Sequence, residues 1–305
     1  MSKRTKVWLW IAIAAVVAGL ILFGVVMSMA GWDFMKLSTV QYETNTYEIE
    51  EDFQKVWIDT LVANVTLLPH DEDVAKVVCY ESEGTHHDVS VKDGTLVILA
   101  VSTGKWTDNI GINFDSMKIR VYLPKREYSE LFVKAKTGDI NCFVSAKEKI
   151  TLLSGTGDIF AEKVTAGAME ISVSTGTTTI KDVTCENEIK ASTATGRINV
   201  INVQCKSFTS EGSTGDITME WLVAQDRIYV RRSTGSVKFD RCNAWELIQV
   251  EVNTGDVRGS FLMGKKFSVR TGTGSVDVPE STEGSGECRI STQTGNVRIT
   301  IEEGI

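Results

Sequence analysis

Histidine is nearly absent from this chain of 305 residues. The three histidines are His70, His86 and His87, and none follows residue 87. A Ser/His/Asp hydrolase or a histidine-dependent metal centre in the rest of the chain is therefore excluded. His86 and His87 are adjacent, and an extended backbone sends adjacent side chains to opposite faces. We therefore expect no metal site shared by these two residues.

Basic residues are also scarce. The chain has 32 basic and 40 acidic side chains, a formal net charge of −8. Because Lys3, Arg4 and Lys6 lie in the first six residues, the remainder carries a net charge of −11. This balance excludes nucleic acid as a partner, because binding its phosphates requires a positive surface. It also predicts repulsion of anionic lipids and anionic wall polymers.

Only one long hydrophobic run is present, from Val7 to Ala30. At about 1.5 Å per helical residue it can cross a bilayer core about 30 Å thick. Basic residues precede the run, and tryptophans occur near both of its ends, as at membrane interfaces: Trp8, Trp10 and Trp32. We expect residues 1–6 to be a cytoplasmic tail, residues 7–30 a single-pass anchor in the cell membrane, and the C-terminal domain extracytoplasmic. A signal peptide cleaved after Ala30 stays open as an alternative.

Proline is rare and glycine is frequent, with 3 and 25 residues respectively, which favours repeated turns over helical packing. Nine glycines follow threonine at intervals of 19 to 21 residues. Such a period is typical of a solenoid whose repeats stack on their neighbours. We expect an all-β, single-domain β-solenoid, a parallel β-helix with coils of about 19–20 residues. The predicted turn residues are Gly138, Gly157, Gly176, Gly196, Gly215, Gly235, Gly255, Gly274 and Gly295.

Counting from each glycine assigns the faces of the coils. Positions −7 and −5 and positions +2 and +4 are mostly apolar, which predicts two inward-facing strands per coil. Between them, glycine supplies the positive φ of a type II turn. Position −4 should face solvent, and sequential stacking would place unlike charges side by side there: Glu211, Arg231, Glu251 and Arg270.

Five of the six cysteines occupy core positions or small-residue corner positions of the repeats. Cys142, Cys242 and Cys288 fall in columns otherwise filled by apolar residues, so we expect them to act as small core residues. Cys185 and Cys205 are one coil apart, about 4.8 Å if the coils stack as parallel strands. A disulfide between these two residues therefore stays open.

The remaining segments are less regular. We expect residues 31–52 to form a juxtamembrane spacer, residues 53–135 irregular opening β-strands that cap the solenoid, and residues 136–305 the regular repeat. The chain closes with Ile299-Thr300-Ile301-Glu302-Glu303, whose carboxylates could discourage end-to-end pairing of the last coil.

Acidic residues after the repeat glycines are the first candidates for binding chemistry. Asp139 and Asp158 are the only pair in adjacent coils and are weak candidates for calcium, which prefers oxygen ligands. Short polar residues at this position are also suited to leaving a turn. We expect no catalytic residues and no cofactor, because no polar residues converge on one face.

The motifs together resemble a known family. Val65-Thr66-Leu67-Leu68-Pro69, a strand closing in Leu123-Pro124, and repeated Thr-Gly-Asp-Ile coils resemble the bacterial putative-adhesin family of β-strand-repeat envelope proteins of unknown function, over residues 45–303. The resemblance implies an exported, non-catalytic envelope protein with no catalytic residues to assign. Thr178 departs from the pattern, because it occupies a position where an apolar residue is expected.

These observations predict a membrane-anchored extracytoplasmic β-solenoid that acts as a binding, adhesion or scaffolding module. Its partner would be a protein or a cell-wall glycan. An accessory protein of an envelope-stress sensing system is the alternative. A polysaccharide-active β-helix enzyme fits less well, because the outward charges are mixed in sign and scattered.

Overall fold

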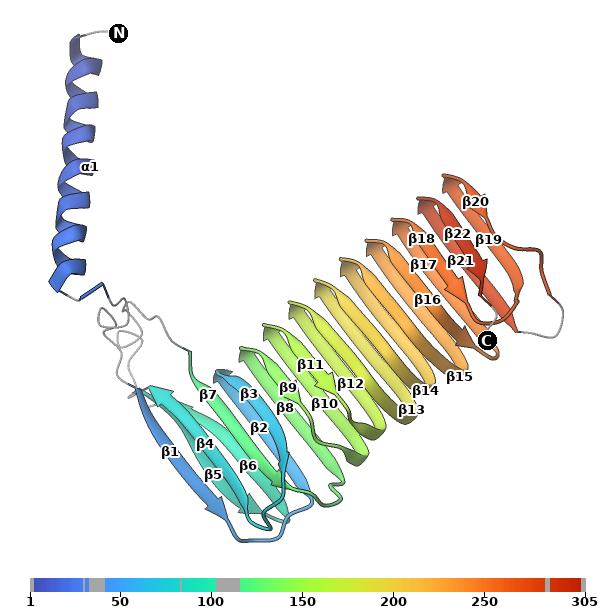
Figure 1. The fold of residues 1–305 in the computed structure, drawn as a ribbon, viewed down its shortest axis with the longest axis horizontal. Helices are drawn as coiled ribbons and strands as arrows, with labels where there is room; N and C mark the ends of the chain where they lie inside the picture. Colours follow the sequence, from blue (N-terminus) through green and yellow to red (C-terminus); the bar gives the residue numbers. More distant parts are fainter. Residues whose placement is uncertain are drawn as a thin grey trace.

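The computed structural model describes residues 3–29, 31–32, 42–82, 84–102, 116–282 and 286–302. Helix α1 (Lys3–Met29) precedes a continuous 22-stranded sheet that coils into a solenoid of about eight turns (Figure 1). The segment Arg4–Met29 of helix α1 is long and apolar enough to span a membrane. The predicted fold class is confirmed. The cleavage position Ala30 lies outside the described residues.

The coiled sheet forms two layers, and hydrogen-bonded neighbours define the order of strands in each. The first layer runs through β5 (Thr85–Lys92), β6 (Thr95–Ser102), β2 (Lys55–Val62), β8 (Glu130–Thr137), β10 (Ala146–Thr156), β12 (Thr165–Thr175), the second halves of β13 (Thr178–Thr195), β14 (Ile198–Thr214) and β15 (Ile217–Thr234), then β17 (Leu247–Thr254), β21 (Glu287–Thr294) and β19 (Lys266–Thr273).

The second layer faces the first across the core (Figure 1). It runs through β1 (Tyr42–Ile49), β4 (Ala75–Ser82), β7 (Lys118–Pro124), β3 (Asn64–His70), β9 (Ile140–Cys142), β11 (Ile159–Glu162), the first halves of β13, β14 and β15, then β16 (Val237–Ala244), β18 (Val257–Phe261), β22 (Val297–Ile301) and β20 (Val276–Asp277).

Alternation of side chains along the strands builds the core. Val237 and Phe239 in one layer and Ile228 and Val230 in the other are all buried. The two predicted inward-facing strands per coil are therefore confirmed. Burying each large apolar side chain stabilises the fold by about 1.5–3 kcal/mol, and the pattern recurs along the solenoid up to its last coil. The coil at the far end is less complete, since Val276 is 45% exposed.

The Thr-Gly pairs form one corner of each coil. Their glycines have φ between 126° and 152°, a region that residues with a Cβ rarely adopt. Each of eight glycines also donates its backbone N–H to a threonine carbonyl of an adjacent coil at 2.8–3.1 Å. A Cβ on Gly215 would lie 1.8 Å from the carbonyl oxygen of Gly196. The expected type II turn is wrong, because the third residue of such a turn has φ near +80°. The φ values of the repeat glycines are well above this value.

A second corner of the coils has no glycine, so the glycine period did not predict it. In five successive coils the residue six positions after the repeat glycine has φ between 50° and 56°. These residues are Lys163, Asp182, Asn202, Trp221 and Arg241. Asn202 donates to the Asp182 carboxylate at 2.6 Å, and the Arg241 guanidinium lies 4.7 Å from the centroid of the Trp221 ring. Side-chain contacts between coils therefore offset the left-handed backbone.

A few polar groups are buried in the core. The Thr178 side chain is buried, and its hydroxyl has no hydrogen-bond partner among the described residues. Arg232 is also buried and donates to the Ser210 hydroxyl at 2.9 Å. A Cβ on Gly212 would lie 1.8 Å from Arg232 Nη1, so glycine leaves room for this side chain. Burial lowers the pKa of Arg232 to about 10.

The coils do not stack in sequence order at the C-terminal end. Strand β21 lies between β17 and β19, and β22 lies between β18 and β20. In Figure 1 the red strands accordingly lie between orange ones. The predicted neighbours Glu211, Arg231 and Glu251 are confirmed, but Arg270 lies beside Ser291 rather than Glu251. The last strand is internal, so Glu302 does not protect the end of the rod, and Glu303 lies outside the described residues.

The opposite end of the rod is closed by antiparallel pairs. β1 pairs with β4, β4 with β7, and β5 with β6, whereas the coils themselves pair in parallel. Strand β1 falls within residues 31–52, where the sequence indicated a spacer, so that interpretation is wrong for Tyr42–Ile49. The sequence of β1 alternates weakly, because the strand lies at the sheet edge and only Ile49 is buried among its residues.

All six cysteines are buried free thiols. Cys185 and Cys205 are partners in the parallel register, but no disulfide joins them. Burial raises the pKa of Cys142 to about 11 and those of Cys242 and Cys288 to about 12. The expected core positions of these three residues are confirmed.

The corner geometry predicts the effect of replacing its glycine. Gly215→Val should lower the free energy of unfolding by at least about 2 kcal/mol, because valine meets both the strained φ and the Gly196 carbonyl. Thr214→Val places the same side chain at the exposed neighbouring position and should cost less than about 0.5 kcal/mol. Thermal melting of the two variants compares them, and an unchanged melting curve for Gly215→Val would show the corner assignment to be wrong.

Burial of the thiols predicts slow labelling. In the native protein at pH 8, maleimide should modify Cys142, Cys242 and Cys288 far more slowly than in guanidinium chloride, because only the accessible thiolate reacts. Mass spectrometry of peptides from both samples measures this difference. Labelling at equal rates in the two samples would contradict the assigned core positions.

Candidate functional site: a polar groove at the end of the solenoid

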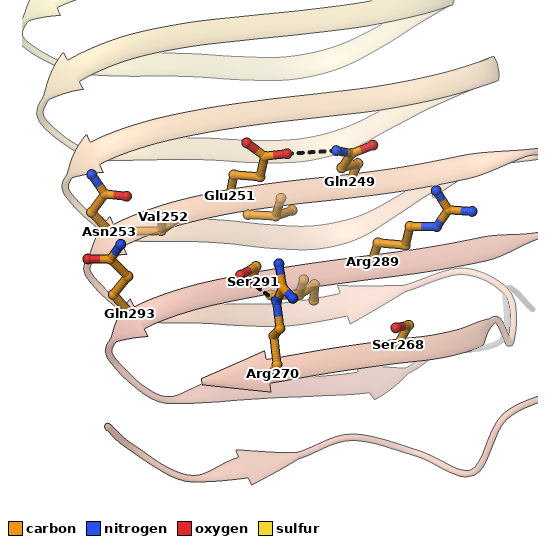
Figure 2. Close-up of a pocket in the computed structure, with 11 residues that line it drawn as sticks. Gln249, Glu251, Val252, Asn253, Ser268, Arg270, Arg289, Ser291 and Gln293 are labelled. Carbon is orange, nitrogen blue, oxygen red and sulfur yellow. Dashed lines mark hydrogen bonds between the residues drawn. The ribbon is translucent and has the colours of Figure 1, made fainter. Parts of the chain in front are cut away.

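An open groove crosses the first layer where β17, β21 and β19 lie side by side. It has a volume of about 420 Å³. Figure 2 shows its polar side chains on three adjacent strands. They are Gln249, Glu251 and Asn253 from β17, Arg289, Ser291 and Gln293 from β21, and Ser268 and Arg270 from β19.

The exchanged order of the coils produces this groove. Gln249, Arg289 and Ser268 form one outward row across the three strands, and Glu251, Ser291 and Arg270 form the next. In the second row the short Ser291 side chain lies between two long ones. The floor is consequently low at Ser291, and longer side chains border it.

Hydrogen bonds hold several of the bordering groups. Gln249 Nε2 donates to Glu251 Oε1 at 2.7 Å, and Arg270 Nε donates to the Ser291 hydroxyl at 3.1 Å (Figure 2). The Tyr229 hydroxyl lies 3.5 Å from Glu251 Oε2. Burial, followed by the nearby Glu251 carboxylate, raises the pKa of Tyr229. Arg289 pairs with Glu287 on its own strand.

The residues that line the groove suit binding better than catalysis. Glu251 is the single carboxylate among them, so the acid pair of a glycosidase is missing from this lining. Cysteine and histidine are also missing from it. Two guanidinium groups and three side-chain amides provide fixed donors and acceptors instead. The sequence does not reveal this site, because stacking in sequence order would place β19 directly on β17, whereas β21 lies between them.

The calcium candidates lie at the Thr-Gly corner. Asp139 Oδ1 accepts the backbone N–H of Asp158 at 2.8 Å, and Asp158 Oδ1 accepts that of Thr177 at 2.7 Å. Asp216 makes the same bond to the backbone of Ser236 at 2.8 Å. These carboxylates therefore join one coil to the next. Calcium binding by Asp139 and Asp158 stays a prediction.

A buried polar cluster lies inside the cap, where the sequence analysis expected none. Among the described residues, Cys79, Glu81 and His87 form the one group that could hold a metal ion, with ligand atoms within 4.8 Å of one another. His86 is exposed and His87 buried, as their adjacency predicts. Alternation along β4 places both Cys79 and Glu81 inside the cap. This alternation is the feature of the sequence that could have indicated a buried carboxylate.

Hydrogen bonds within the cap already satisfy this cluster. His87 Nδ1 lies 2.8 Å from Glu81 Oε1, and His87 Nε2 lies 2.9 Å from the Thr60 hydroxyl. Glu81 Oε2 accepts a bond from Asn45 at 2.8 Å. The His87 backbone N–H also donates to Glu81 Oε1 at 2.5 Å. One carboxylate thus ties β1, β4 and β5 together, which is the arrangement of a structural network rather than an open metal site.

The buried histidine predicts how the stability of the cap depends on pH. Burial lowers the pKa of His87, although the hydrogen bond to Glu81 acts in the opposite direction. Histidine in the unfolded chain therefore takes up its proton first, near pH 6.5. The contribution of His87 to stability is complete above about pH 6.5 and is lost as pH falls through the lower folded pKa.

Urea unfolding of the full chain between pH 7.5 and 5 measures this effect. The unfolding free energy of the unmodified protein should decrease as the pH falls over this range. The unfolding free energy of His87→Gln should decrease less steeply. His86→Gln, which changes the exposed neighbour, is the control and should keep the original slope. Equal slopes for all three proteins would contradict the assignment.

Comparisons with known proteins agree with this architecture. No curated protein is detectably similar to the chain. A structure described as that of a putative lipid binding protein from Parabacteroides distasonis is 15% identical, with a TM-score of 0.56, over 86% of this chain and 98% of that one. A putative adhesin from Bacteroides fragilis is 16% identical, with a TM-score of 0.48, over 85% of this chain and 97% of that one.

The first of these likenesses supports the fold alone, because sequence identity is low. The family described as Toastrack DUF4097 matches residues 53–304, which include all the coils and most of the cap. The groove and the cap cluster both lie within the matched region. The chain therefore belongs to the Toastrack DUF4097 family.

Proposed function

We propose that the protein is a membrane-anchored, non-catalytic binding module of the bacterial cell envelope that holds a glycan in the polar groove. The groove carries this proposal, because it is lined by guanidinium, amide and hydroxyl groups without an acid pair. Such groups bind polar ligands through several hydrogen bonds. Names given to proteins of similar fold, adhesin among them, are compatible with a binding role.

The architecture supports display of the groove away from the anchor. Strand β1 begins at Tyr42, thirteen residues after α1 ends at Met29. Even fully extended, this connection spans at most about 45 Å, so the cap is tethered near the predicted membrane segment. The groove lies at the opposite end of the stacked coils. A rigid rod between anchor and groove suits a module that reaches for a ligand.

Filling the groove should abolish binding. Ser291→Tyr places a large side chain on its low floor, and Thr300→Tyr places the same side chain at an exposed position of β22 in the other layer. The full chain in lipid nanodiscs is incubated with purified cell walls and with a panel of insoluble polysaccharides, and co-sedimentation is measured. We expect Ser291→Tyr to lose at least tenfold in affinity and Thr300→Tyr to bind normally.

Two outcomes would contradict the proposal. Equal binding by Ser291→Tyr and the unmodified protein would mean that the groove is not the site. If the unmodified protein binds none of the polysaccharides, the glycan-binding role is overturned. That result would favour the alternative, an accessory part of an envelope-stress system.

A further inference from the structure

We propose that the ligand of this groove is an anionic polysaccharide whose carboxylate or sulfate groups are bound by Arg270 and Arg289. The inference rests on the proposed function, since it specifies the chemistry of the glycan held there. Guanidinium presents a planar set of donors that matches a carboxylate or sulfate in two-point contact.

Arg270 is available for such a contact. Its Nε donates to the Ser291 hydroxyl, which orients the guanidinium over the groove (Figure 2). No carboxylate of the described residues lies within 4.0 Å of it. Arg270 is exposed, and among the described residues its hydrogen bond is made by Nε, so its terminal Nη groups are open to an external anion.

The position of Arg270 follows from the exchanged coils. Sequential stacking would place Arg270 beside Glu251, where the two charges would neutralise each other. Insertion of β21 instead puts Ser291 between them. Glu251 is held on the far side by Gln249 and lies near the Tyr229 hydroxyl. Arg270 and Glu251 are thus kept at separate borders of the groove.

Arg289 supplies the second cation. It belongs to the neighbouring strand and is displaced by two residues along it from Arg270, so their Cα atoms are about 8 Å apart. The side chain of its partner Glu287 is 44% exposed, and a solvent-accessible ion pair contributes only about 0–1 kcal/mol. An incoming anion can therefore share or replace this contact, which allows two anionic groups of one polymer to bind together.

Local charge in the groove differs from that of the rest of the surface. Two arginines and one glutamate line it, a charge of +1 among the lining residues, in a chain whose net charge is −8. Glu287, the partner of Arg289, lies outside this lining. The acidic remainder discourages nonspecific adsorption of polyanions. Binding should consequently depend on these two arginines in particular, with the amides of Asn253 and Gln293 available for sugar hydroxyls.

Oligogalacturonate and its fully methyl-esterified form test the charge while keeping the sugar constant. Isothermal titration with the full chain in nanodiscs at low salt should show binding of the acidic form at least tenfold tighter than of the neutral ester. A sulfated oligosaccharide titrated in parallel should also bind, because the arginines recognise the shared anionic chemistry. Affinity should fall as salt is raised, since screening weakens exposed charge pairs.

Arg270→Gln with Arg289→Gln should abolish the preference for the acidic form. Arg258→Gln removes one positive charge from an exposed position of β18 in the opposite layer, and should leave binding within about twofold. If the unmodified protein binds the acidic and esterified forms equally and Ser291→Tyr binds neither, the groove binds a glycan without selecting its charge. This result would overturn the anionic assignment but leave the proposed function intact. An equal loss in Arg258→Gln would show nonspecific attraction and also overturn it. If the unmodified protein binds no polysaccharide, neutral or acidic, both the proposed function and the anionic assignment are rejected.

Discussion

Close contact between backbones at the Thr-Gly corner is the constraint on which the rest of the structure depends. A side chain on Gly215 would collide with the carbonyl of Gly196, and the same crowding recurs from coil to coil. Glycine therefore allows the turn and also lets neighbouring coils approach to hydrogen-bonding distance. Asp139 and Asp158 strengthen the stack by accepting backbone N–H groups of the following coil.

A regular interior leaves the outward side chains free to vary. Core columns must be apolar and of suitable size, because each inward residue packs against equivalents above and below. Outward residues face solvent, and their identity affects stability little. The glutamine, arginine and serine residues of the groove are positions of this kind. A solenoid can therefore carry a binding site on one layer without changing its core, which is consistent with a shared fold and diverse surfaces.

The exchange of the last coils connects topology with the proposed chemistry. A sequential solenoid would pair Arg270 with Glu251 and present a flat surface with balanced charge. Inserting β21 separates these residues and leaves a low floor at Ser291. The cap shows a related effect at the other end, where antiparallel pairing brings Glu81, His87 and Asn45 together from three strands. Both polar sites thus occur where the simple repeat ends.

The sequence by itself determined the apolar N-terminal helix, the solenoid, the glycine corners and the buried columns, because each depends on a local run or period of apolar residues or on a conformation that only glycine adopts readily. It did not reveal β1, which buries only Ile49, or the left-handed corner at Asn202, which has no glycine. Only the tertiary structure decided which coil lies beside which. A parallel strand pairs equally well with any coil of the same pattern, so the order of the last coils depends on the path of the connecting chain and on packing at the end of the rod. The groove depends on that order.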